Sequence, residues 1–203
     1  LDPKAISRSK MVKIFDQMRK LKGYTDAGSP GRDWNVATGM VMDGKAAFQI
    51  MGDWAKGEFS AKGLTPGKDY LCSPTPSNNG YLYNVDSFVF YNVKGADKLE
   101  GQKLLASLIM GKNFQKVFNM YKGSIPARLD VSMADFDDCA KKSNSDLNAA
   151  SKAGGLMPSY AHGMALKGAQ SGAITDVVTE HFNSNMSSKD AAMKLAAAVK
   201  ASL

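Results

Sequence analysis

The sequence lacks the short motifs that mark common enzyme active sites. It contains no glycine-rich dinucleotide fingerprint, no phosphate-binding P-loop, no G-x-S-x-G nucleophile elbow and no H-E-x-x-H zinc motif. Histidine, a frequent acid, base and metal ligand, occurs only twice in 203 residues. We therefore expect no catalytic residue, no cofactor and no metal, and the chain is predicted not to be an enzyme.

Long hydrophobic runs are also missing. No apolar stretch approaches the length of about 20 residues that a membrane-spanning helix needs. The opening LDPKAISRSK is polar and has no apolar region of the kind found in a secretory signal. Hydrophobic residues nevertheless make up 44% of the chain and charged residues 22%, which is typical of folded globular domains.

Arginine is scarce for a chain with a net charge of +7. Beyond the first few residues it occurs only as Arg19, Arg32 and Arg128, although arginine supplies much of base and phosphate recognition. The lysines are spread singly and do not cluster with aromatic side chains. The charge is interpreted as a solubilising surface, and we do not expect a nucleic acid as a partner.

Cysteine occurs twice, as Cys72 and Cys139. The two are too far apart for a C-x-x-C redox motif and too few for a zinc site. The residues alone leave two alternatives, a pair of buried thiols or one disulfide that closes a long loop. A disulfide of this span would stabilise the fold by about 4 kcal/mol and would imply an oxidising compartment.

Few stretches of the sequence have the pattern of a β-strand. Residues 46–51 form a continuous apolar run, which predicts a strand buried on both faces of a mainly parallel sheet. Residues 81–93 are rich in Tyr, Phe and Val, and a short strand is expected at 70–72. The class is α/β, but a doubly wound sheet needs more strands than these. The chain therefore resembles part of something larger.

Helices are expected in the remainder, from apolar periodicity and from capping residues. They are predicted at 9–22, 34–43, 53–62, 97–110, 113–121, 134–143, 147–153, 164–183 and 187–202. Asp33 is the expected N-cap of the second, and Asp137 with Asp138 suits the start of a helix.

A set of aromatic and short polar side chains stands at predicted strand ends and loop mouths. Taken singly, each is more often structural, because a tryptophan is usually core and an asparagine usually lies in a turn. Taken together they suit a sugar, whose C–H faces stack on aromatic rings while its hydroxyls need hydrogen-bond donors and acceptors. The predicted ligand-binding residues are Trp34, Trp54, Asn84, Asp86, Lys122 and His162.

The other acidic and histidine side chains give weaker indications of function. Asp53, Glu58 and Asp86 could form the carboxylate pair of a glycosidase, but nothing in the sequence determines their separation. His181 is expected to be an exposed or half-buried helical residue. The alternative to a sugar-binding protein is a secreted carbohydrate-active enzyme whose catalytic carboxylates lie in a missing half, outside this chain.

Several stretches resemble one family, the periplasmic solute-binding proteins of bacterial ABC sugar importers, and most closely its glucose/mannose-binding branch. They are GRDWNVATGMVMDGKAAFQIMGDWAKGEF, TPGKDYLC, NVDSF, GSIPARLDV and FDDCAKKS. The resemblance implies the periplasm as location, and a monosaccharide, glucose above all, with an ABC permease as partners. It also implies that Cys72 and Cys139 form a disulfide, and that Trp54 and Trp34 are aromatic walls of the sugar site.

The resemblance further implies a two-lobed fold, periplasmic-binding-protein-like and of the maltose-binding type. This chain would be its C-terminal half. Residues 1–90 and 123–203 would belong to the C-terminal lobe, and residues 91–122 would return to the N-terminal lobe. The missing lobe, or a second copy of the chain, would then be a further partner.

Overall fold

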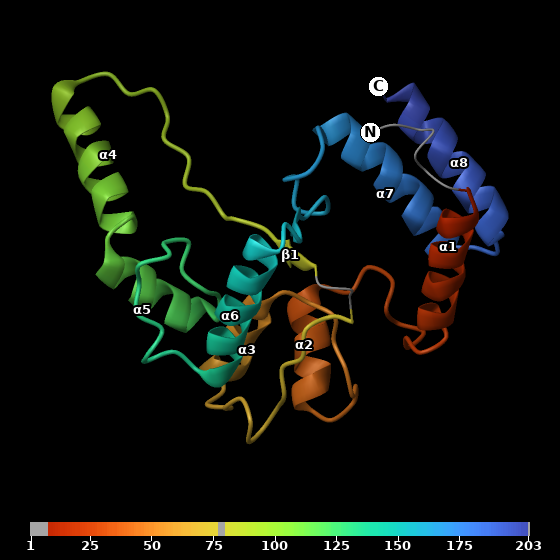
Figure 1. Ribbon diagram of the computed structural model, residues 1–203, viewed down its shortest axis with the longest axis horizontal. Helices are drawn as coiled ribbons and strands as arrows, with labels where there is room; N and C mark the ends of the chain where they lie inside the picture. Colours follow the sequence, from red (N-terminus) through yellow and green to blue (C-terminus); the bar gives the residue numbers. More distant parts are fainter. Residues whose placement is uncertain (1–7, 77–79, 203) are drawn as a thin grey trace. The chain divides into compact units, whose positions relative to one another are not determined.

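The computed structural model describes residues 8–76 and 80–202, and helices dominate them. The chain divides into two compact units (Figure 1). One unit comprises the described parts of Leu1–Arg32 and Pro158–Leu203, and the other comprises Asp33–Met157. Among the described residues, no helix is both long enough and apolar enough to cross a bilayer.

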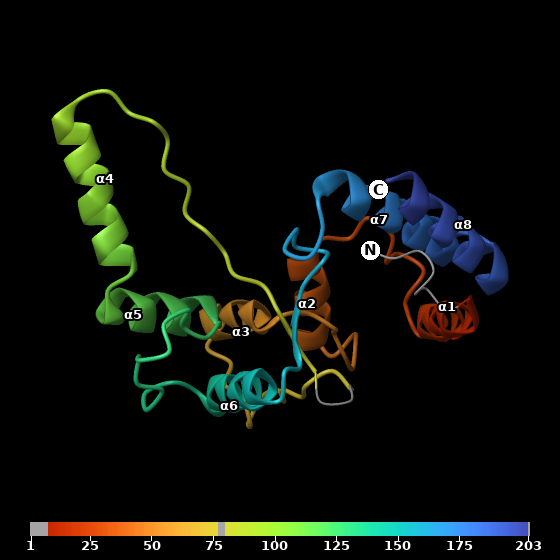
Figure 2. The same cartoon turned by 45° about the horizontal axis from the view of Figure 1, so that its top comes forward.

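The first unit is built from three helices that lie side by side in both views (Figures 1 and 2). They are α1 (Arg8–Lys22), α7 (Gly168–Asn183) and α8 (Ser188–Ala201). Their apolar faces meet around Phe15, Val177 and Val199, all almost completely buried. Burial of these faces, rather than intrinsic helix propensity, stabilises the three-helix arrangement.

The expectation that His181 is exposed or half-buried is wrong, because its side chain is completely buried in this core. The imidazole packs against Phe15 with 4.7 Å between the ring centroids. Neither ring nitrogen finds a hydrogen-bond partner among the described residues. Burial lowers the pKa of His181, because the charged form would lose its hydration, and Arg19 lowers it further.

The second unit carries most of the predicted site. Its elements in chain order are α2 (Trp34–Met42), the 3-10 turn η1 (Asp53–Ala55), α3 (Lys56–Ala61), β1 (Tyr81–Tyr83), α4 (Ala96–Ile109), α5 (Lys112–Lys122), α6 (Asp138–Lys152) and β2 (Leu156–Pro158), whose last residue begins the other unit.

The predicted helices are confirmed with small shifts of their ends, apart from three differences. The helix expected at 53–62 is divided into the 3-10 turn η1 and the short helix α3. The predicted helices 134–143 and 147–153 form one continuous helix, α6. The helix expected at 164–183 begins only at Gly168, as α7. Asp33 stands at the N-cap of α2, but its side chain makes no capping hydrogen bond.

The predicted strands are largely wrong. Residues 46–51 form no strand in the structure, and Phe48 is 90% exposed. Only Tyr81–Tyr83 of the stretch 81–93 is a strand, and it pairs with β2 in a two-stranded sheet. At 70–72 the structure has one isolated bridge, between Pro66 and Tyr70. A strand needs a neighbour for its backbone hydrogen bonds, and the part of the chain that the structure describes supplies few.

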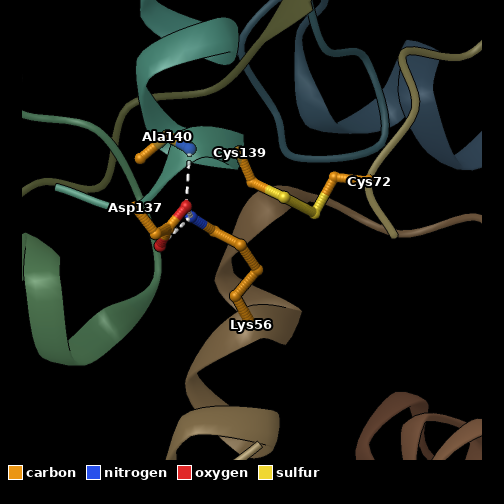
Figure 3. Close-up of a disulfide and its surroundings, with 5 residues drawn as sticks. All are labelled: Lys56, Cys72, Asp137, Cys139 and Ala140. Carbon is orange, nitrogen blue, oxygen red and sulfur yellow. Dashed lines mark hydrogen bonds and ion pairs between the residues drawn. A yellow bond between two sulfur atoms is a disulfide. The ribbon is translucent and has the colours of Figure 1, made fainter. Parts of the chain in front are cut away.

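The predicted disulfide is confirmed. Cys72 and Cys139 are bonded, with their Cα atoms 5.8 Å apart, and they tie the loop after α3 to the first turn of α6 (Figure 3). Asp137 lies two residues before Cys139 and caps α6 by accepting a hydrogen bond of 2.8 Å from the backbone N–H of Ala140. The same carboxylate binds Lys56 at the start of α3, with its two oxygens 2.9 and 2.8 Å from Nζ.

Candidate functional site

Three of the predicted site residues lie together in the second unit. Asn84 and Asp86 follow β1, where the chain leaves the sheet, and the Asn84 amide donates a hydrogen bond of 3.3 Å to Asp86. Lys122, the last residue of α5, forms an ion pair with the other oxygen of Asp86. The Asp86 side chain remains 64% exposed. A carboxylate held in this way is oriented by its partners and still open to a ligand.

Trp54 is the middle residue of η1 and follows Asp53 directly. Its indole folds back over the backbone of Gly52, where an added Cβ would lie only 2.0 Å from the ring. A side chain at position 52 would therefore displace the ring. This contact explains the glycine before Asp53.

Asp53 directly precedes Trp54 in the chain, and its carboxyl group lies near the ammonium group of Lys122. The carboxyl is half-buried, and burial raises its pKa, while the nearby ammonium groups of Lys56 and Lys122 act in the opposite direction. Lys122 therefore has an acidic neighbour in η1 and another, Asp86, after β1. From the sequence, Asp53 is expected only as a possible glycosidase carboxylate. Its position next to Trp54 was the signal that could have included it in the site.

An open hollow lies on the same side of α5 as Lys122. It is lined by Phe114, Val117, Phe118, Tyr121 and Lys122. The Lys122 ammonium lies 5.9 Å from the centroid of the Phe118 ring, in range of a cation–π interaction. Aromatic surface thus continues from the charged cluster along the helix.

The two remaining predicted residues lie elsewhere in the chain. Trp34 is the first residue of α2 and is 40% exposed. Its backbone carbonyl accepts hydrogen bonds from the side chains of Thr38 and Gln49, at 3.0 and 2.9 Å. His162 belongs to the other compact unit, is exposed, and is hydrogen-bonded to the Ser159 hydroxyl through Nδ1 at 2.7 Å.

The arrangement can bind a polar ligand but has the marks of no particular reaction. Among residues 8–76 and 80–202, no three His, Cys, Asp or Glu side chains gather in a way that could hold a metal ion. The cluster offers one open carboxylate, one amide, one ammonium and an indole face. These are the groups that recognise hydroxyls and the apolar faces of a ring.

Known proteins are similar in sequence to this chain over nearly its whole length. A probable sugar-binding periplasmic protein of Brucella suis is 46% identical over 202 residues, which cover 99% of this chain and 48% of that protein. A protein of Rhizobium meliloti with the same description is also 46% identical and is covered to 49%. More distantly, a xylose/arabinose-binding protein of Haloferax volcanii is 28% identical over 197 residues, 95% of this chain and 41% of that protein. The chain thus spans about half the length of these relatives.

The profile of one family, described as bacterial extracellular solute-binding protein, matches residues 2–149. That range includes β1, α5, the disulfide and five of the six predicted site residues. The family consists of binding proteins that act outside the cytoplasm, and not of enzymes, so the alternative of a carbohydrate-active enzyme is excluded. The chain belongs to the bacterial extracellular solute-binding proteins.

Proposed function

We propose that this chain is part of a periplasmic protein that binds a monosaccharide, glucose, and delivers it to an ABC-type permease. The observation that carries the proposal is the cluster of Asn84, Asp86 and Lys122, with Asp53, the residue before Trp54, near the Lys122 ammonium group. The relatives described as sugar-binding support it, because they match over the whole of this cluster.

The chemistry of a sugar fits each member of the cluster. Asp86 would accept hydrogen bonds from two hydroxyls, and such charge-assisted bonds are stronger than neutral ones. Lys122 would donate to a hydroxyl oxygen while it stays paired with Asp86. Trp54 would stack on the C–H face of the pyranose. Trp34 and His162 would add a second aromatic wall and a further polar contact.

The carrier would work by hinge closure. We propose that residues 1–90 and 123–203 belong to one lobe and that residues 91–122 pass into the other. A sugar that contacts both lobes stabilises the closed form, and the permease recognises that form. Glucose, rather than another sugar, is supported by the resemblance of GDW, NVDSF and GSIPARLDV to the glucose/mannose-binding branch.

The test is calorimetric titration of the full-length protein with glucose, mannose and xylose. Trp54→Ala is expected to cost about 1–3 kcal/mol of binding free energy, a range taken from stacking of bases on aromatic rings. Asp86→Asn keeps the shape of the side chain but removes a charged acceptor, so it should also weaken binding.

Asp146→Asn is the matched control, because Asp146 is also paired with a lysine, Lys142, on α6. It should leave the affinity unchanged. Unchanged glucose affinity in both Trp54→Ala and Asp86→Asn would refute the site. Tighter binding of xylose than of glucose by the wild type would refute the choice of sugar.

A further inference from the structure

The end of α5 and the start of α3 meet through their backbones. A Cβ built on Gly57 would lie 2.8 Å from the carbonyl oxygen of Lys122 and 3.2 Å from that of Tyr121. A Cβ built on Gly123 would lie 2.7 Å from the backbone nitrogen of Gly57 and 3.0 Å from the carbonyl oxygen of Asp53. The two glycines therefore face each other with no room for a side chain between them. We call this pair the glycine joint.

The two glycines of the joint differ in how well glycine suits the local backbone. Gly123 ends α5 with φ of 85°, a left-handed conformation that favours glycine in any case. Gly57 is the second residue of α3, and glycine in a helix is less favourable than alanine, by up to about 1 kcal/mol in a helix interior. Its presence there is explained by the approach of α5. Gly39 in α2 and Gly101 in α4 show the contrast, since a Cβ at either would meet nothing within 4 Å.

A clamp holds α3 on the other side of the joint. Lys56, which precedes Gly57, is 5% exposed and is bound by the carboxylate of Asp137 (Figure 3). Asp137 is itself held at the N-terminus of α6, next to the disulfide between Cys72 and Cys139. The start of α3 is therefore fixed between α5 and α6, and it cannot move away from α5 without straining this clamp.

The joint lies beside two proposed sugar-binding residues. Trp54 precedes Gly57 by one helical turn, and Lys122 directly precedes Gly123. Figures 1 and 2 show the C-terminal end of α5 close to α3 in both views. The joint thus fixes how closely the backbone after Trp54 approaches the end of α5 that carries Lys122.

We propose that Gly57 and Gly123 are positioning residues: they hold Trp54 and Lys122 at the separation that a sugar ring requires, without touching the sugar. This rests on the proposed function for the identity of the ligand. The contact between α3 and α5 itself does not depend on it. Binding sites that are loosened by about 1 Å lose much of their efficiency, so a methyl group in the joint should act on affinity.

The first experiment is the crystal structure of the Gly57→Ala variant of this chain, with Gly39→Ala as control. The contact of 2.8 Å must lengthen to at least 3.4 Å, the start of ordinary van der Waals contact, so α3 and the end of α5 should move apart. The Trp54–Lys122 separation should change in Gly57→Ala and stay as it is in Gly39→Ala. An unchanged separation in Gly57→Ala would overturn the proposal.

The second experiment is glucose titration of the same variants in the full-length protein, together with their thermal unfolding. We expect Gly57→Ala to lose at least about tenfold in affinity while it remains folded, and Gly39→Ala to lose nothing. A purely structural role would lower the melting temperature and leave the affinity of the folded protein intact, which would refute positioning.

A second variant decides the matter if Gly57→Ala does not fold. Gly123→Asn keeps a residue that tolerates the left-handed turn but adds a Cβ to the joint. Reduced glucose affinity of folded Gly123→Asn supports the proposal, and wild-type affinity overturns it. A wild-type protein that binds none of the sugars refutes the proposed function alone, and the crystal structures then decide whether the joint sets the separation.

Discussion

Lys56 is a charged side chain in a position where the sequence indicates an exposed helix surface. It is nevertheless 5% exposed, and its ammonium group is bound by the Asp137 carboxylate, 81 residues away in the chain. Breaking a buried ion pair by removing one member costs more than replacing both, because the remaining charge is left without compensation. The Asp137 side chain is 34% exposed and also accepts from Ala140, so the two ends of this pair are not equivalent.

The unequal ends give a prediction. Asp137→Ala removes the ion-pair partner of the buried ammonium together with a helix cap, so it should destabilise the second unit by about 3–5 kcal/mol. Lys56→Met leaves a carboxylate that water can still reach, and it should cost less. The double variant should recover part of the loss of Asp137→Ala.

Urea unfolding followed by tryptophan fluorescence measures this, since Trp34 and Trp54 both lie in the second unit. The control is Lys142→Met, which breaks an exposed i, i+4 pair with Asp146 and should change stability by no more than about 0.5 kcal/mol. Equal losses for Asp137→Ala and Lys56→Met would contradict the asymmetry.

The residue scale also shows what a sequence can reveal of a site. Residue type and place at the ends of predicted elements suffice to predict Asn84, Asp86 and Lys122 as candidates, and the structure brings these three together. They do not suffice for Gly57 and Lys56, because the roles of these two depend on backbone and carboxylate atoms far away in the chain. Close approach and burial of a charge leave no periodic trace in the sequence.

At the scale of elements, the helices were predictable and the strands were not. An amphipathic helix satisfies its own backbone hydrogen bonds, so its pattern suffices to predict it. A strand depends on a neighbour, and the apolar run at 46–51 has none in the described part of the chain. Phe48 and Ile50 of this run are exposed. The run is apolar, as a buried strand would be, but no neighbouring strand among the described residues pairs with it.

Helix α7 carries a titratable group, the side chain of His181, into the core that it forms with α1 and α8. The groups of α1 that act on the imidazole are Arg19, Asp16 and Lys22; Arg19 and Lys22 lower its pKa, whereas Asp16 raises it, and burial has the largest effect. The pKa of His181 in the folded protein is therefore below the value of 6.5 for an unperturbed histidine.

The sign of the effect on stability follows from proton binding. Below pH 6.5 the unfolded chain takes up a proton that the folded core resists, so folding stability should fall as the pH decreases from 6.5 toward the lower pKa of the folded state. His181→Leu should remove this component and be more stable than the wild type at pH 5.

Thermal unfolding between pH 5 and pH 8 tests the prediction, monitored by helical circular dichroism. The control is His162→Gln, which replaces the other, exposed histidine and should keep the wild-type pH profile. A His181→Leu variant with the same loss of stability at low pH as the wild type would assign the effect to other groups.

At the scale of the whole molecule, the described residues leave much apolar surface uncovered. It is concentrated on the extended stretch after β1 and on α4 and α5, where Val89 is 73%, Leu104 65% and Leu108 61% exposed. Patches of this kind on a folded chain usually mark a surface that meets a partner. We propose that the other half of the two-lobed protein covers it, in keeping with relatives of about twice the length.

The isolated chain of 203 residues should then differ from the full-length protein in two ways. Binding of glucose should be undetectable below millimolar concentrations, because such sites bury most of the ligand surface and one wall of the proposed cleft would be absent. The hydroxyls on the open side would keep their water and gain no new partner. The uncovered apolar surface of α4 should at the same time drive self-association.

Calorimetry and light scattering of the same sample test both expectations, with the full-length protein as the reference. Leu104→Lys with Leu108→Lys is the discriminating variant, since it places charge on the exposed face of α4 without filling the proposed sugar site. It should make the isolated chain monomeric and leave its weak glucose binding as it was. A wild-type chain that is monomeric and binds glucose at micromolar concentrations would place the complete site within these residues, and the proposed division into lobes would be wrong.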